Sequence, residues 1–184
     1  MPMQPPALLV IDVQQGLDDA AYGARNNPGT ETNIAALLAA WRNAERPVLH
    51  VRHCSVEAGS PLRADAPGNA YKPEAQPRDG EPEFCKSVNS AFIGTTLEAY
   101  LRERGIGELV IVGLTTDHCV STSTRMAGNL GFSVTLVGDA TATFERTGPD
   151  GTHYSAEQMH GANLASLHGE FCTVRSTAEV LATL

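Results

Sequence analysis

Apolar residues in this chain follow two alternating patterns, short continuous runs and helical spacing. Residues 7–11 form an unbroken apolar run of strand length that stops at Asp12, a pattern typical of a strand buried on both faces of a parallel sheet. From Thr30 onward the apolar residues recur on one face of a helix, at Ile34, Leu37, Leu38 and Trp41. Pro47 closes this segment, and a second strand is predicted at residues 48–51.

The alternation resumes in the second half of the chain. Two capping-box spacings, Thr95 with Glu98 and Ser176 with Glu179, predict helix starts. The same patterns predict further strands and helices: strands at 108–113, 132–137 and 171–174, and helices at 120–130 and 156–167. We therefore expect residues 1–184 to form a single α/β domain, a doubly wound three-layer αβα sandwich with a mainly parallel sheet of about six strands.

Residues 54–84 interrupt the alternation. They contain five prolines and three glycines, which prevent a long helix or a regular strand ladder. A loop of this length in a compact domain usually serves as a lid, a pocket wall or a subunit contact.

Charge and composition restrict the class of partner. The 184 residues contain 13 Lys and Arg against 21 Asp and Glu, giving a net charge of −8 and a sequence pI near 5.1, which opposes binding to nucleic acid or anionic lipid. No apolar window approaches the length of a membrane span, and the first residues lack the pattern of a secretory signal. We expect a cytoplasmic protein whose partner is a small molecule. The four scattered cysteines are then expected to be free thiols, at Cys54, Cys85, Cys119 and Cys172.

Two reactive side chains are predicted at one edge of the sheet, the edge at which open α/β folds bind ligands. Asp12 ends the first strand, and Cys119 follows the strand at 108–113, at the start of the next helix. Unpaired backbone N–H groups and the helix dipole lower a thiol pKa at such a position and offer donors to an oxyanion. Each residue also has an ordinary structural interpretation, because a strand-end Asp commonly caps a turn and a lone Cys is commonly inert.

Three motifs carry a resemblance to a known family. They are Ile11-Asp12-Val13-Gln14, the segment 86–95 with Lys86 and Ala91-Phe92, and Gly113-Leu114-Thr115-Thr116-Asp117-His118-Cys119-Val120. These resemble the Asp-x-Gln strand end, the Lys and Ala-Phe segment, and the Gly-x-x-Thr-x-x-Cys-Val elbow of the isochorismatase-like cysteine hydrolase superfamily. That superfamily includes nicotinamidases, N-carbamoylsarcosine amidases and ureide or biuret hydrolases. The resemblance covers nearly the whole chain, with the motifs in the right order.

The resemblance implies a catalytic triad in which Cys119 is the nucleophile, Asp12 transfers protons and Lys86 is the third member. A carboxylate and a cation beside a thiol supply the base and the positive field that a thiol nucleophile needs. The resemblance also implies a cis peptide bond between Leu114 and Thr115, and an oxyanion hole formed by the backbone N–H groups of Thr115 and Cys119.

Three further residues are expected to contact the substrate. Phe92 matches an aromatic residue that lines the pocket in relatives. Gln14 is expected to orient Asp12 or the substrate, or else to cap the first loop. His118, beside the nucleophile, is either a pocket residue or a structural histidine.

The chain departs from the metal-binding pattern of nicotinamidases, which carry an Asp-x-His followed by another His after the second strand. Here the region reads His50-Val51-Arg52-His53-Cys54-Ser55, and two strand histidines at this spacing point to opposite faces. We therefore expect no metal and no cofactor. The sequence assigns no role to four of its histidines, His50, His53, His153 and His160.

The leading hypothesis is a cysteine-dependent hydrolase that acts on a small carboxamide, carbamoyl or ureide substrate through a thioester on Cys119. One alternative is an isochorismatase-type vinyl ether hydrolase, which the cysteine disfavours because that chemistry runs without it. The other is a catalytically silent small-molecule binding protein on the same fold. Members of the family commonly associate, so we expect a homo-oligomer, a dimer or a tetramer, with part of residues 54–84 at the interface.

Overall fold

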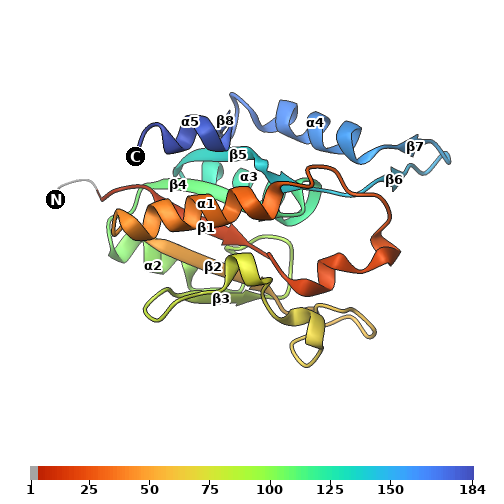
Figure 1. Ribbon diagram of the computed structural model, residues 1–184, viewed down its shortest axis with the longest axis horizontal. Helices are drawn as coiled ribbons and strands as arrows, with labels where there is room; N and C mark the ends of the chain where they lie inside the picture. Colours follow the sequence, from red (N-terminus) through yellow and green to blue (C-terminus); the bar gives the residue numbers. More distant parts are fainter. Residues whose placement is uncertain (1–3) are drawn as a thin grey trace.

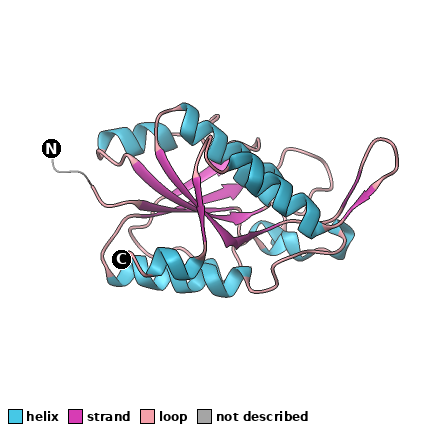
Figure 2. Cartoon of the chain, turned by 90° about the horizontal axis from the view of Figure 1, so that it is seen from above, coloured by secondary structure: helices cyan, strands magenta, loops and turns pink. Residues whose placement is uncertain are grey.

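The computed structural model describes residues 4–184 as three layers, a central β-sheet with helices on both faces (Figure 1, Figure 2). Within these residues the main sheet has six strands in the order β3-β2-β1-β4-β5-β8, and every neighbouring pair is parallel. The strands are β1 (Ala7–Ile11), β2 (Val48–His53), β3 (Glu83–Lys86), β4 (Glu108–Leu114), β5 (Ser133–Ala142) and β8 (Thr173–Arg175). The predicted doubly wound αβα sandwich is confirmed.

Two apolar cores lie on the two faces of this sheet. Leu8 and Leu9 are neighbours on β1, and each is fully buried in a different core because side chains alternate along a strand. Helices α1 (Thr30–Asn43) and α5 (Thr177–Leu181) cover one face, and α2 (Leu97–Glu103), α3 (Ser121–Asn129) and α4 (Ala156–Leu167) cover the other. A small antiparallel hairpin of β6 (Arg146–Thr147) and β7 (His153–Tyr154) extends beyond the sheet (Figure 1). No helix in residues 4–184 has the length and apolar character needed to cross a membrane.

The strand order reverses between β1 and β4. The chain builds outward from β1 to β2 and β3, and then returns to place β4 on the other side of β1. β4 can pair with β1 along its whole length only because residue 113 of β4 is glycine. At Gly113 φ is 127°, and a Cβ atom there would lie 2.0 Å from the Ile11 carbonyl oxygen. The carboxyl ends of β1 and β4 therefore meet at the switch point, where ligands bind in open α/β sheets.

One strand of the sheet was not located by the sequence analysis. β3 is an edge strand at the end of the proline-rich segment, and its inward side chains are Phe84 and Lys86. A four-residue strand with a buried lysine lacks the apolar periodicity that predicts strands. Its register with β2 places Lys86 opposite His53.

One predicted helix cap is confirmed and the other is wrong. The capping box of Ser176 and Glu179 is present at the start of α5. The capping box predicted at Thr95 is absent, since α2 begins at Leu97 with Thr96 at its N-cap position. The Thr95 hydroxyl oxygen accepts a 3.3 Å hydrogen bond from the Leu97 N–H and donates one of 2.6 Å to the Ala91 carbonyl, but the return contact from Glu98 is missing.

The expectation that all four cysteines are free thiols is wrong. Cys54, which directly follows β2, and Cys85, in β3, form a disulfide with their Cα atoms 6.1 Å apart. They meet because β2 and β3 are neighbours, and the Cys54 N–H also donates a 2.7 Å hydrogen bond to the Lys86 carbonyl. Among the described residues the free thiols are Cys119 and Cys172.

Candidate active site

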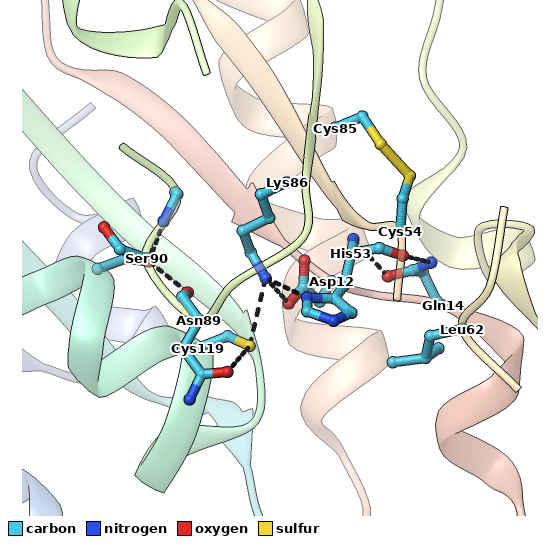
Figure 3. A network of polar contacts seen from close by, with 12 residues as sticks. Asp12, Gln14, His53, Cys54, Leu62, Cys85, Lys86, Asn89, Ser90 and Cys119 are labelled. Carbon is cyan, nitrogen blue, oxygen red and sulfur yellow. Dashed lines mark hydrogen bonds and ion pairs between the residues drawn. A yellow bond between two sulfur atoms is a disulfide. The ribbon is translucent and has the colours of Figure 1, made fainter. Parts of the chain in front are cut away.

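The three residues of the expected triad come together at the carboxyl edge of the sheet (Figure 3). Asp12 follows β1, Lys86 ends β3, and Cys119 lies in the helical turn η5 (Thr116–Val120) that follows β4. The Lys86 Nζ atom lies 2.6 Å from Asp12 Oδ2 and 3.3 Å from Cys119 Sγ. Three different strands therefore deliver the three side chains to one point.

The lysine and the aspartate of this cluster are almost completely buried. Asp12 is 2 % exposed and Lys86 is 1 % exposed. An isolated charge at such a depth is strongly unfavourable, so the short contact between the two groups is what allows both to be buried. Asp12 has a φ of 51°, in the left-handed region that aspartate adopts more readily than most residues.

His53 is a fourth member of the cluster, although the sequence assigned it no role. It is the last residue of β2, and its Nδ1 lies 3.0 Å from Lys86 Nζ. One signal in the sequence could have found it. Because β2 pairs with β1, a polar residue at the carboxyl end of β2 must lie close to Asp12.

The Cys119 thiol has a raised pKa, contrary to the expectation that the start of a helix lowers it. Burial, and next the Asp12 carboxylate, raise the pKa of Cys119 to about 12, although the Lys86 ammonium acts in the opposite direction. Although η5 continues directly into α3, desolvation of the sulfur and the nearby Asp12 carboxylate outweigh any helix effect on the thiol pKa. The thiol is therefore protonated at neutral pH, and it must lose its proton during any reaction in which it attacks.

An acceptor for that proton is present beside the thiol. Asp12 Oδ1 is buried and has no hydrogen-bond partner among residues 4–184. A carboxylate oxygen of Asp12 lies within 4.8 Å of the Cys119 sulfur. The thiol itself is 3.9 Å from Asn89 Oδ1.

A cavity of about 440 Å³ lies over the cluster, and Asp12, His53 and Cys119 line it. This volume lies within the range of small-molecule sites. Its apolar lining comes from six residues: Leu17, Tyr22, Val56, Leu62, Leu114 and Phe144. The rings of Tyr22 and Phe144 stack with their centroids 5.1 Å apart.

Two residues of the expected site also line this cavity. Thr115 is one of them, and the peptide bond between Leu114 and Thr115 is cis, as the resemblance implies. His118 is the other, with a side chain that is 57 % exposed.

The other two expected binding residues lie elsewhere. Phe92 is buried in a core, where its ring stacks on Phe132 with the centroids 5.9 Å apart. Gln14 is fully buried, and its amide bridges the backbone of His53 and the carbonyl of Asn69. Residue spacing could not reveal this, because it does not show which way a side chain points after a strand ends.

The cluster also contains groups of the kind that bind metals. Asp12, His53 and Cys119 each place one potential ligand atom within 4.8 Å of the others. All three side chains contact the Lys86 ammonium, so a cationic side chain already occupies the position between them. His50 lies away from this cluster, with its Nε2 at 2.8 Å from a Glu81 carboxylate oxygen. That no metal is needed remains a prediction.

Comparison with known proteins finds one family. A model of the isochorismatase domain matches residues 6–179. The isochorismatase family protein YrdC of Bacillus subtilis is 43 % identical over 95 % of this chain and 94 % of its own length. A solved structure from Chromobacterium violaceum, assigned to the isochorismatase family, has a TM-score of 0.95 and 48 % identity, and covers 99 % of this chain and 94 % of its own. Ureidoacrylate amidohydrolase RutB of Agrobacterium fabrum is 29 % identical over 94 % of this chain and 90 % of its own length.

Proposed function

The protein belongs to the isochorismatase family of hydrolases, and we propose that it is a cysteine-dependent amidohydrolase. The proposed substrate is a small carboxamide, carbamoyl or ureide compound that forms a thioester with Cys119. The observation that carries this proposal is a single buried ammonium, that of Lys86, in contact with both a thiol and a carboxylate beside a cavity of small-molecule size.

In the first half of the proposed reaction, the Cys119 sulfur attacks the substrate carbonyl carbon while its proton passes to Asp12. We propose Oδ1 as the accepting oxygen, because Oδ2 is held by Lys86 whereas Oδ1 has no partner within residues 4–184. Proton transfer has to accompany attack, since the pKa of the resting thiol is about 12. The Lys86 ammonium, 3.3 Å from the sulfur, stabilises the negative charge that develops there.

The second half releases the products. The carbon–nitrogen bond breaks, and protonated Asp12 gives its proton to the departing nitrogen, which leaves as ammonia or an amine. The same carboxylate then takes a proton from water, and the resulting hydroxide attacks the thioester. The carbon–sulfur bond breaks, and the thiol recovers its proton. Water is the co-reactant, and the backbone N–H groups of Thr115 and Cys119, both cavity-lining residues, are the proposed donors to the carbonyl oxygen.

This arrangement supports acyl–nitrogen chemistry better than hydrolysis of a vinyl ether. A vinyl ether presents no carbonyl carbon at the scissile bond, so it makes no use of a thiol with a proton acceptor beside it. The name of RutB, an amidohydrolase of ureidoacrylate, is also consistent with an amide or ureide substrate for this chain.

A substrate panel tests the proposal. Primary amides, carbamoyl amino acids, ureides and isochorismate are incubated with the protein, and ammonia release and product formation are measured. Hydroxylamine is added to intercept an acyl group as a hydroxamate. We expect hydroxamate from an acyl–nitrogen substrate with the unmodified protein and none with Cys119→Ala. Turnover of isochorismate by Cys119→Ala at the unmodified rate would overturn the proposal.

The role of Asp12 is tested by Asp12→Asn, which keeps the size of the side chain but can neither accept the thiol proton nor return it. We expect kcat to fall roughly 100-fold or more, the usual contribution of general acid–base catalysis. Asp65→Asn is the matched control, because Asp65 is 70 % exposed, pairs with Arg63 and is not among the residues that line the cavity. Retention of more than about a tenth of kcat in Asp12→Asn would remove Asp12 from the mechanism.

A further inference from the structure

The Lys86 ammonium has as many acceptors as it has protons. Its Nζ lies 2.6 Å from Asp12 Oδ2, 3.0 Å from His53 Nδ1 and 3.3 Å from Cys119 Sγ (Figure 3). An ammonium group carries three N–H donors. Two of its acceptors belong to the proposed mechanism, but the imidazole nitrogen has no part in it. Loss of that nitrogen would leave one N–H of a 1 % exposed side chain without an acceptor.

The contact fixes the tautomer of His53. A lysine ammonium can only donate, so Nδ1 of His53 must accept, and a neutral ring then carries its proton on Nε2. Burial, and next the charge of Lys86, lower the pKa of His53, while Asp12 and Glu57 act in the opposite direction. The net effect is a lowered pKa, which favours the neutral ring that the hydrogen bond requires.

The backbone of His53 is itself held in place. Gln14 Oε1 accepts a 2.9 Å hydrogen bond from the His53 N–H, and Gln14 Nε2 donates one of 3.1 Å to the His53 carbonyl. Asn69 Nδ2 donates to the same carbonyl at 2.8 Å. These contacts tie the end of β2 to the segment that follows β1 and to the proline-rich loop.

We propose that His53 is a positioning residue that holds the Lys86 ammonium against the sulfur of Cys119, and that Gln14 acts by holding His53. With the imidazole in place, each N–H of Lys86 has a fixed acceptor, so the ammonium stays directed at the thiol. Without it, the ammonium is free to turn and the developing thiolate loses part of its stabilisation. The consequence for Cys119 rests on the proposed function, whereas the state of His53 does not.

The first test needs neither a substrate nor a variant that must remain active. Long-range ¹H–¹⁵N correlation spectra of the ¹⁵N-labelled protein at neutral pH distinguish the two neutral tautomers from the imidazolium. The His53 signals are assigned by their loss in His53→Asn. We expect an unprotonated Nδ1 and a protonated Nε2. An imidazolium, or a ring protonated on Nδ1, would overturn the inference.

The second test compares two replacements of the imidazole. His53→Asn places an amide oxygen near the position of Nδ1, whereas His53→Leu fills a similar volume with no acceptor. The probe is p-nitrophenyl acetate, whose acetyl carbon bonds to the Cys119 sulfur as p-nitrophenolate leaves. The measured quantity is the rate of the initial burst of p-nitrophenolate at pH 8. We expect this rate to be about tenfold lower in His53→Leu than in the unmodified protein, the effect of losing one hydrogen bond to a charged group. In His53→Asn we expect it to stay within about threefold of the unmodified rate.

Rescue by asparagine separates positioning from a merely structural role, which would slow both variants alike. His153→Leu is the control, because it makes the same replacement on the exposed β6–β7 hairpin. Thermal melts confirm that each variant is folded. A burst in His53→Leu at the unmodified rate, or one in His53→Asn as slow as in His53→Leu, would overturn the inference. A burst that Cys119→Ala leaves unchanged contradicts the proposed function instead, and the tautomer measurement still decides the state of His53.

Discussion

The disulfide between Cys54 and Cys85 should make a large contribution to stability, and the double variant Cys54→Ser/Cys85→Ser measures it. The two residues are 31 positions apart in the sequence. In the chain-entropy description, closing a loop of that length in the unfolded state is worth about 3.7 kcal/mol at 25 °C. For a domain of this size, such a loss corresponds to a fall of roughly 7–15 °C in the melting temperature.

Urea denaturation of the oxidised protein and of the double variant provides the measurement. Dithiothreitol should lower the midpoint of the unmodified protein to that of the double variant and leave the double variant itself unchanged. Thiol titration of the urea-denatured protein before reduction should find only Cys119 and Cys172 free. Equal midpoints for the oxidised protein and the double variant, or four titratable thiols before reduction, would refute the reasoning.

Three further predictions concern stability at low pH, the close approach of β4 to β1 at Gly113, and the effect of removing metals. Burial alone would raise the pKa of Glu31, but hydrogen bonds from Arg25 and Lys72 lower it to about 2. The ionised Glu31 therefore contributes to the stability of the folded protein above about pH 4.5, and this contribution is lost as the pH falls towards 2. Urea titrations between these pH values should show a shallower decline of stability with falling pH for Glu31→Gln than for the unmodified protein. Gly113→Ala should yield little folded protein in a solubility and melting assay, because its Cβ would meet the Ile11 carbonyl oxygen at 2.0 Å, and a normal melt would contradict the described register. Dialysis against EDTA should leave activity unchanged, because an ammonium already lies between the candidate ligands, and activity restored by zinc or iron would contradict this.

Much of the fold could be predicted from the sequence because burial on both faces leaves a direct record in it. A strand such as β1 must be apolar at every position, which is why residues 7–11 stand out as a continuous run. β3 leaves no such record, because one of its two buried side chains, Lys86, is polar and the residues of its outward face, Glu83 and Cys85, are exposed. The Cys54–Cys85 disulfide depends on the pairing of β2 with β3, so it could not be inferred without that strand.

The meeting of Asp12, Lys86 and Cys119 was predictable from the sequence, but the part of His53 and the electrostatics of the site were not. Strand ends and motif order indicate that Asp12 and Cys119 meet, and the structure brings them together. The thiol pKa depends on how deeply the sulfur is buried and how close the carboxylate lies, quantities that spacing does not contain. The inclusion of His53 likewise depends on strand order, because only the pairing of β2 with both β1 and β3 places it beside Lys86.

The stacked pair of Tyr22 and Phe144 has an evolutionary consequence. The reactive groups sit at strand ends, where sheet register fixes their positions, but these two rings come from connecting segments that tolerate exchange and change of length. Replacing either ring would reshape the cavity without moving Lys86 or Cys119. Natural variation at these two positions can therefore change which small molecules the cavity accepts while the cluster of Asp12, Lys86 and Cys119 is kept, so selection for a new substrate would act first on the residues that line the cavity.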